Sequence, residues 1–134
     1  MSAYQAWAAC GFSGKRLLTS AEWTAAAFGT PDATDDYASA CNTGGGIVSA
    51  GAPVKTGSRS GCVSSAGAFD MAGNVAEWTM DSHLSTQYRG GSWDDGSPVM
   101  QFMNGLRDAG DTALTSRTDQ ASTQDNAIGF RCAR

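Results

Sequence analysis

The fold of this chain is decided by residues 69–78, which read Phe69-Asp70-Met71-Ala72-Gly73-Asn74-Val75-Ala76-Glu77-Trp78. Glycine, which permits tight backbone turns, stands here between large aromatic side chains and carboxylates that are costly to bury without a partner. Such a mixture is typical of irregular backbone held around a polar core or an ion. Two further blocks follow, Arg89-Gly90-Gly91-Ser92-Trp93 and Ile128-Gly129-Phe130-Arg131-Cys132.

The length and composition indicate one folded, loop-rich domain. The chain has 134 residues, of which 17 are glycine, well above the average usage of about 7%. The net charge is −4 and no run of either sign occurs, which argues against a nucleic acid or an anionic membrane surface as the partner. No apolar run approaches the ~20 residues that span a bilayer, so we expect no membrane insertion.

Four cysteines stand at positions 10, 41, 62 and 132, and if all are bridged they permit three pairings. They form no C-x-x-C pair, and His83 is the only histidine of the sequence, so a zinc site is not expected. Cys41 and Cys62 bracket a segment rich in Gly, Ser and Thr that has little apolar content to fold it. We favour the disulfides Cys41–Cys62 and Cys10–Cys132, which imply an oxidising destination; the alternative is four free thiols in a cytosolic protein.

The pattern along the chain predicts two helices and then short strands, which is an α+β plan. Capping boxes at Ser2–Gln5 and Thr19–Glu22 predict the two helix starts, with a short extended connector at residues 15–18. Residues 30–67 and 108–125 read as loops. The expected strands are Asn74–Thr79, Gln87–Gly90, Gln101–Leu106 and Ala127–Cys132.

The motifs resemble one known family. Residues 14–23, Gly14-Lys15-Arg16-Leu17-Leu18-Thr19-x-x-Glu22-Trp23, are similar to a block of the formylglycine-generating-enzyme-like branch of the C-type lectin fold. The three blocks quoted above match the other motifs of that branch in the same order. The resemblance implies a single domain over residues 1–134, with two helices packed on a small twisted antiparallel sheet and long loops. The family's usual N-terminal strand region does not precede Met1, and the abrupt start in a helical pattern suggests either a shortened chain or the tail of a longer protein.

The same resemblance bears on the disulfides and on catalysis. C-type lectin folds pair a cysteine of the first helix with one of the last strand, and Cys10 and Cys132 stand at those places. Members that oxidise a sulfatase cysteine need two reactive cysteines shortly after the R-G-G-S segment, and residues 93–103 contain none. Members that form sulfoxides need iron held by several histidines. We therefore expect no enzymatic activity.

A non-catalytic branch, the variable proteins of diversity-generating retroelements, resembles the chain most closely. The resemblance implies a hypervariable segment at residues 89–134 that recognises a protein or glycan receptor, on a cell surface or a phage tail. The alternatives are an oxidoreductase of the formylglycine-generating or sulfoxide-forming kind that has lost its catalytic cysteines or histidines, and a structural module of a surface protein.

The predicted ligand-binding residues mix aromatic, acidic, amide and guanidinium groups, as adaptable interfaces do. They are Trp93, Asp94, Asp95, Ser97, Gln101, Asn104, Arg107 and Asp108, with a second group at Asp119, Gln124 and Asp125. The alternative is an ordinary solvated loop in which Trp93 belongs to the core.

The opening stretch also holds a candidate calcium site. Asp70, Gly73, Val75 and Glu77 offer two carboxylates and two backbone carbonyls around one glycine turn, and hard oxygens are the ligands of calcium. The resemblance supports this set, because related formylglycine-generating enzymes bind calcium at the matching positions. The alternative is that Asp70 and Glu77 hydrogen-bond nearby amides and Arg16 or Arg131.

Overall fold

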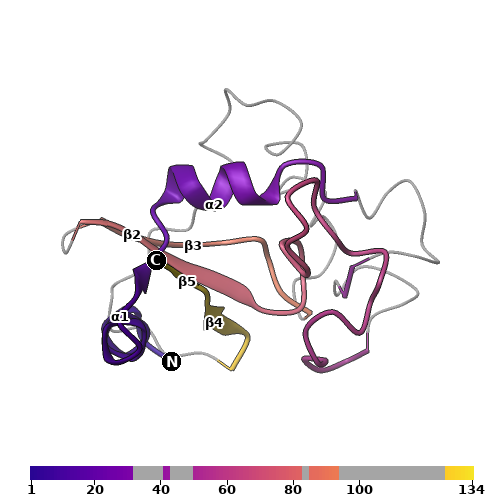
Figure 1. Cartoon of the computed structure of the whole chain (residues 1–134). Helices are drawn as coiled ribbons and strands as arrows, with labels where there is room; N and C mark the ends of the chain where they lie inside the picture. The colour runs from indigo at the N-terminus through magenta and orange to yellow at the C-terminus, as the bar shows by residue number, and fades with distance from the viewer. Residues whose placement is uncertain (32–40, 43–49, 83–84, 94–125) are drawn as a thin grey trace.

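The computed structural model describes residues 1–31, 41–42, 50–82, 85–93 and 126–134 of the chain. These ranges contain two helices and five short strands in the order α1, β1, α2, β2, β3, β4, β5 (Figure 1). The domain is therefore α+β, as the sequence predicts. Within the ranges given, no helix is both long enough and apolar enough to cross a membrane.

Helix α1 (Ala3–Phe12) begins at the predicted capping box. The hydroxyl of Ser2 accepts a hydrogen bond from the Gln5 backbone N–H at 3.3 Å, and the Gln5 side chain accepts one from the Ser2 N–H at 2.9 Å. Two backbone donors that the helix cannot satisfy itself are thereby paired. The helix leads into the short strand β1 (Arg16–Leu17), which is the predicted extended connector.

Helix α2 (Ser20–Ala27) begins in the same way at Thr19 and Glu22. Its first turn is also tied to the sheet, because the Ser20 N–H donates to a carboxylate oxygen of Asp81 at 2.8 Å. An acidic group at this end is favoured by the helix dipole. Both predicted helix starts are thus confirmed.

The strands form two small sheets. In the larger sheet the order is β3-β2-β4, with β2 (Ala76–Ser82) in the centre between β3 (Ser85–Arg89) and β4 (Ile128–Phe130). Strand β5 (Cys132–Ala133) pairs antiparallel with β1 and so brings the end of the chain beside its first connector.

The expectation of a purely antiparallel sheet is wrong for one pair. Strands β2 and β3 form an antiparallel hairpin, but β2 and β4 run parallel, with Ala76, Glu77 and Trp78 opposite Ile128, Gly129 and Phe130. A hairpin forces antiparallel pairing, whereas a connection of a dozen or more residues allows a parallel return. Residues 90–127 separate β3 from β4, which is ample for such a return.

Three predicted strands differ from the observed ones in their bounds. The predicted strand Gln87–Gly90 begins two residues earlier, at Ser85, and ends one residue earlier, at Arg89. Strand β2 starts two residues later than the predicted Asn74–Thr79, because Asn74 has φ of 63°, a left-handed conformation that a strand does not contain. The predicted strand Ala127–Cys132 is divided into β4 and β5 at Arg131. The predicted strand Gln101–Leu106 lies outside the described residues.

The first four residues of strand β2 are buried on both faces, and the two faces differ in chemistry. Ala76 and Trp78 belong to the apolar cluster that includes α1, and the Trp78 ring meets Tyr88 of β3 edge-on at 5.3 Å between centroids. Glu77 and Thr79 alternate with them and hydrogen-bond to side chains of α2. The two-residue period of a strand thus gives each helix its own side of β2. Figure 1 shows α1 and α2 on opposite sides of this strand.

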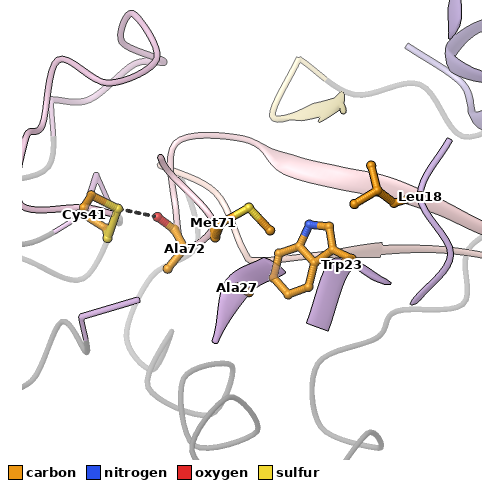
Figure 2. Close-up of a cluster of buried hydrophobic side chains, with 7 residues drawn as sticks. Leu18, Trp23, Ala27, Cys41, Met71 and Ala72 are labelled. Atoms are coloured by element: carbon orange, nitrogen blue, oxygen red, sulfur yellow. Dashed lines mark hydrogen bonds between the residues drawn. A yellow bond between two sulfur atoms is a disulfide. The ribbon is translucent and has the colours of Figure 1, made fainter. Parts of the chain in front are cut away.

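The core on the α2 side surrounds one tryptophan (Figure 2). Trp23 is 1% exposed and belongs to one buried cluster with Leu18, Ala27 and Met71. The disulfide between Cys41 and Cys62 belongs to the same cluster, so the loops before β2 are attached to this core.

Both predicted disulfides are present. Cys10–Cys132 joins α1 to β5 over 122 residues of sequence, and Cys41–Cys62 closes a loop of 21 residues. In the chain-entropy view, bridges of these lengths stabilise a domain by roughly 3–5 kcal/mol each. The two bridges indicate that the protein matures in an oxidising, extracellular type of environment.

Candidate functional site

A pocket of about 250 Å³ opens beside the glycine turn that precedes β2. It lies between this turn, the loop around residue 56 and the end of β4. The residues that line it are Thr56, Asp70, Asn74, Val75, Glu77, Phe130 and Arg131. Three of the four residues predicted to hold calcium are therefore brought together around one cavity, and Gly73 adjoins them in sequence.

The backbone of the turn is held by contacts with three separate segments. Gly73 donates its N–H to the carbonyl of Gly90 at 2.7 Å, and Asn74 donates its N–H to the carbonyl of Asn42 at 2.6 Å. The Asn74 side chain bonds both backbone groups of Val54. Because Asn42 and Asn74 are 0% and 4% exposed, this network is shielded from water and holds the pocket wall in one conformation.

Asp70 is the most unusual group in the pocket. Its backbone has φ of 56° and the residue is only 4% exposed. One carboxylate oxygen, Oδ2, accepts a hydrogen bond from the Gly57 N–H at 2.8 Å. The other, Oδ1, is buried and has no hydrogen-bond partner among the described residues. An unsatisfied buried acceptor costs about 1–3 kcal/mol, and more when it is charged, so this oxygen favours a cation or donor in the pocket.

Both carboxylate oxygens of Glu77 accept hydrogen bonds from other side chains. Arg131 binds both of its carboxylate oxygens, with Nη2 at 2.6 Å from Oε1 and Nε at 3.1 and 3.0 Å from Oε1 and Oε2. The indole N–H of Trp23 donates to Oε2 at 2.7 Å. The structure therefore selects Arg131 from the two arginines considered, whereas Arg16 pairs instead with Glu22.

Arg131 connects the two carboxylates. Burial acts to lower the pKa of Arg131, but the hydrogen bonds and charge of Glu77, together with the charge of Asp70, outweigh it and raise the pKa above its ordinary value. The guanidinium also donates to the backbone carbonyl of Phe69 at 2.8 Å. It thus holds the end of β4 against the turn.

Asp70 is the residue of this pocket that could hold a cation such as calcium. The unpartnered Oδ1 is a hard anionic oxygen, and Gly73 and Val75 have carbonyls in the same turn. Glu77 fits as a ligand only if it is shared with Arg131. Among the described residues no group of three or more His, Cys, Asp or Glu side chains is placed to hold a metal, so backbone oxygens would supply much of the coordination.

Of the predicted ligand-binding residues, only Trp93 is within the described part of the chain. It is partly buried, and its backbone N–H donates to the Asn74 carbonyl at 3.0 Å, which attaches it to the glycine turn. The others lie outside the described residues: Asp94, Asp95, Ser97, Gln101, Asn104, Arg107, Asp108, Asp119, Gln124 and Asp125.

Sequence reasoning missed three members of the pocket: Thr56, Asn74 and Phe130. The Gly-Asn pair before β2 was a usable signal for Asn74, since asparagine tolerates the left-handed conformation and often bonds neighbouring backbone. Thr56 gave no such signal, because it stands in a polar loop without a pattern.

One family model matches the whole chain. It is the model of the sulfatase-modifying factor enzyme 1-like domain (FGE-sulfatase), and the match covers residues 1–134. No curated protein matches the chain significantly.

Proposed function

The chain belongs to the sulfatase-modifying factor enzyme 1-like family, and on this premise we propose that it is a non-catalytic domain that displays a ligand-binding segment. The family includes both catalytic and non-catalytic members. The proposed ligand is a protein or glycan receptor, and the proposed contact residues lie between Trp93 and Asn126. The scaffold is proposed to be of the C-type lectin type.

The observation that carries this proposal is the way in which the segment from Trp93 to Ala127, the display segment, is attached. At its start, Trp93 donates its N–H to the carbonyl of Asn74. At its end, the carbonyl of Ala127 accepts a hydrogen bond from the N–H of Ala76 at 2.9 Å. Both ends are thus bonded to positions only two residues apart on the scaffold. A segment that leaves and returns at one place can change in sequence while the scaffold keeps its own contacts.

The state of the cysteines supports the non-catalytic part of the proposal. All four cysteines of the chain are in disulfides, and none is free. Cysteine-oxidising members of the family use two reactive thiols, and a thiolate is the form that reacts. The described disulfides leave no thiol for that chemistry.

The finer proposal is that the protein is a variable protein of a diversity-generating retroelement, on a cell surface or a virion. The motif order supports it, since R-G-G-S-W and G-F-R bracket residues 94–128. The DNA beside the gene tests it directly. We expect a near-identical template repeat that differs at adenines, close to a reverse transcriptase gene. Flanking DNA with neither would refute this reading.

Calcium is proposed as a structural ion of the scaffold. Asp70, with the carbonyls of Gly73 and Val75 and a share of Glu77, would hold it in the pocket. Its contribution would be to neutralise the buried Asp70 carboxylate and to fix the glycine turn. A rise in melting temperature on addition of calcium, lost in Asp70→Asn, is the expected result. Equal melting curves in calcium and in chelator would refute the proposal.

A further inference from the structure

Both carboxylate oxygens of Glu77 already accept hydrogen bonds from buried or half-buried donors. A carboxylate offers about four lone-pair sites, two on each oxygen. In this structure three N–H groups face these sites: the Arg131 Nη2 donates to Oε1, the Trp23 indole donates to Oε2, and the single N–H of the Arg131 Nε is shared between both oxygens. Glu77 is 6% exposed, so water does not provide an alternative arrangement. A metal ion that bound Glu77 would therefore compete with these donors for the same two oxygens.

Of the two residues that donate to Glu77, Arg131 is the one that a cation would displace more easily. The Trp23 indole is fixed in the core at 1% exposure, whereas the Arg131 side chain is 26% exposed and lines the pocket. Arg131 is also a cation, and it lies close enough to Asp70 for the charge of that carboxylate to raise its pKa. A metal ion in the pocket would therefore be repelled by the Arg131 guanidinium, which is attracted to the same two carboxylates.

We propose that Arg131 competes with a divalent cation for Glu77 and so sets the cation affinity of this pocket. The inference rests on the calcium proposal above and goes beyond it by naming the residue that tunes the site. Arg131 stands at the junction of β4 and β5 and also donates to the carbonyl of Phe69, so it attaches the last strand to the glycine turn. The competition between Arg131 and a cation is reciprocal. A cation that draws Glu77 away from Arg131 weakens the attachment of the last strand, by the same factor as Arg131 weakens the cation.

Calorimetric titration of the folded chain with calcium tests this. We expect Arg131→Gln to bind calcium at least about tenfold more tightly than the original chain, since it removes the competing charge. Arg131→Lys keeps the charge but cannot make the three contacts with Glu77, so its calcium affinity is expected to lie between those of the original chain and Arg131→Gln. The matched control is Arg16→Gln, which removes the same charge at the exposed pair with Glu22 and should leave the affinity unchanged.

Several outcomes separate the two proposals. Arg131→Gln and Arg131→Lys with affinities equal to or weaker than that of the original chain would overturn the competition while leaving the calcium site in place. Absence of binding in every variant up to about 10 mM calcium, above the weakest range of extracellular modules, would overturn both. Circular dichroism checks that each variant is folded. If Arg131→Gln does not fold, the comparison with Arg131→Lys decides. The near-ultraviolet circular dichroism of the tryptophans gives a second readout, because the Trp23 indole N–H donates to the contested carboxylate.

Discussion

Replacing Glu77 with glutamine is the sharpest test of how the scaffold is held together. Glutamine has the same shape but only one acceptor oxygen, and its amide group places donors where Arg131 and Trp23 also donate. Breaking a buried ion pair by removing one partner costs about 3–5 kcal/mol. Because the Arg131 side chain is 26% exposed and regains some water, we expect the lower part of that range, about 3 kcal/mol.

A loss of this size is easy to measure. For a domain of this length it corresponds to a fall of about 10 °C in melting temperature, or about 1–2 M in the urea midpoint. Urea unfolding followed by circular dichroism, with disulfides intact, gives the free energy of unfolding directly.

The matched control is Glu22→Gln. Glu22 forms the other bidentate pair of the described residues, with Arg16, but the side chains of that pair are 42% and 48% exposed. Glutamine at this position also keeps the capping box, which accepts either residue. The Glu22 variant is expected to be far less destabilised than the Glu77 variant. Equal effects of the two substitutions would refute the reasoning, because burial would then not decide the strength of the pair.

Three further predictions follow from single features of the structure. The pKa of Glu22 is lowered to about 2, first by its hydrogen bonds with Arg16. The contribution of the Glu22 carboxylate to stability is therefore present above the ordinary pKa of 4.5 and is lost as the pH falls toward 2. The urea midpoints of the original chain and of Glu22→Gln should converge over that pH range. Gly90→Ala should destabilise the domain by about 1–3 kcal/mol in thermal unfolding, because φ at Gly90 is 93° and the new Cβ would lie 2.9 Å from a backbone oxygen and 3.0 Å from the Trp23 indole. The control Gly11→Ala lies in open space on a helix and should be neutral or stabilising in the same experiment. Thiol titration of the denatured, unreduced protein should find no free thiol and four after reduction; any free thiol before reduction would contradict the two bridges.

Local signals predicted the parts of the fold that are local in sequence. Both helix starts follow from capping boxes that span four residues, and the second helix ends before Gly29, as expected. The Cys41–Cys62 bridge followed from the composition of the loop between its ends. These features depend on neighbouring residues, so one sequence is enough to infer them.

Features that depend on distant partners were not predicted. The parallel pairing of β4 with β2 brings together residues about fifty positions apart, and no local periodicity encodes its direction. The burial of Asn42 gave no signal either, because it stands in a polar loop and its partners Ala52 and Asn74 are 10 and 32 residues away. The arginine that pairs with Glu77 was left open between two candidates for the same reason.

The central claim is that the scaffold carries stability while residues 94–125 carry recognition. It is tested most directly by the melting temperatures of a set of variants randomised at the seven proposed contact positions Asp94, Asp95, Ser97, Gln101, Asn104, Arg107 and Asp108. We predict that most of these variants melt within a few degrees of the original chain, as substitutions away from a core do. A set in which most variants fail to fold would contradict the claim, because those residues would then belong to the scaffold.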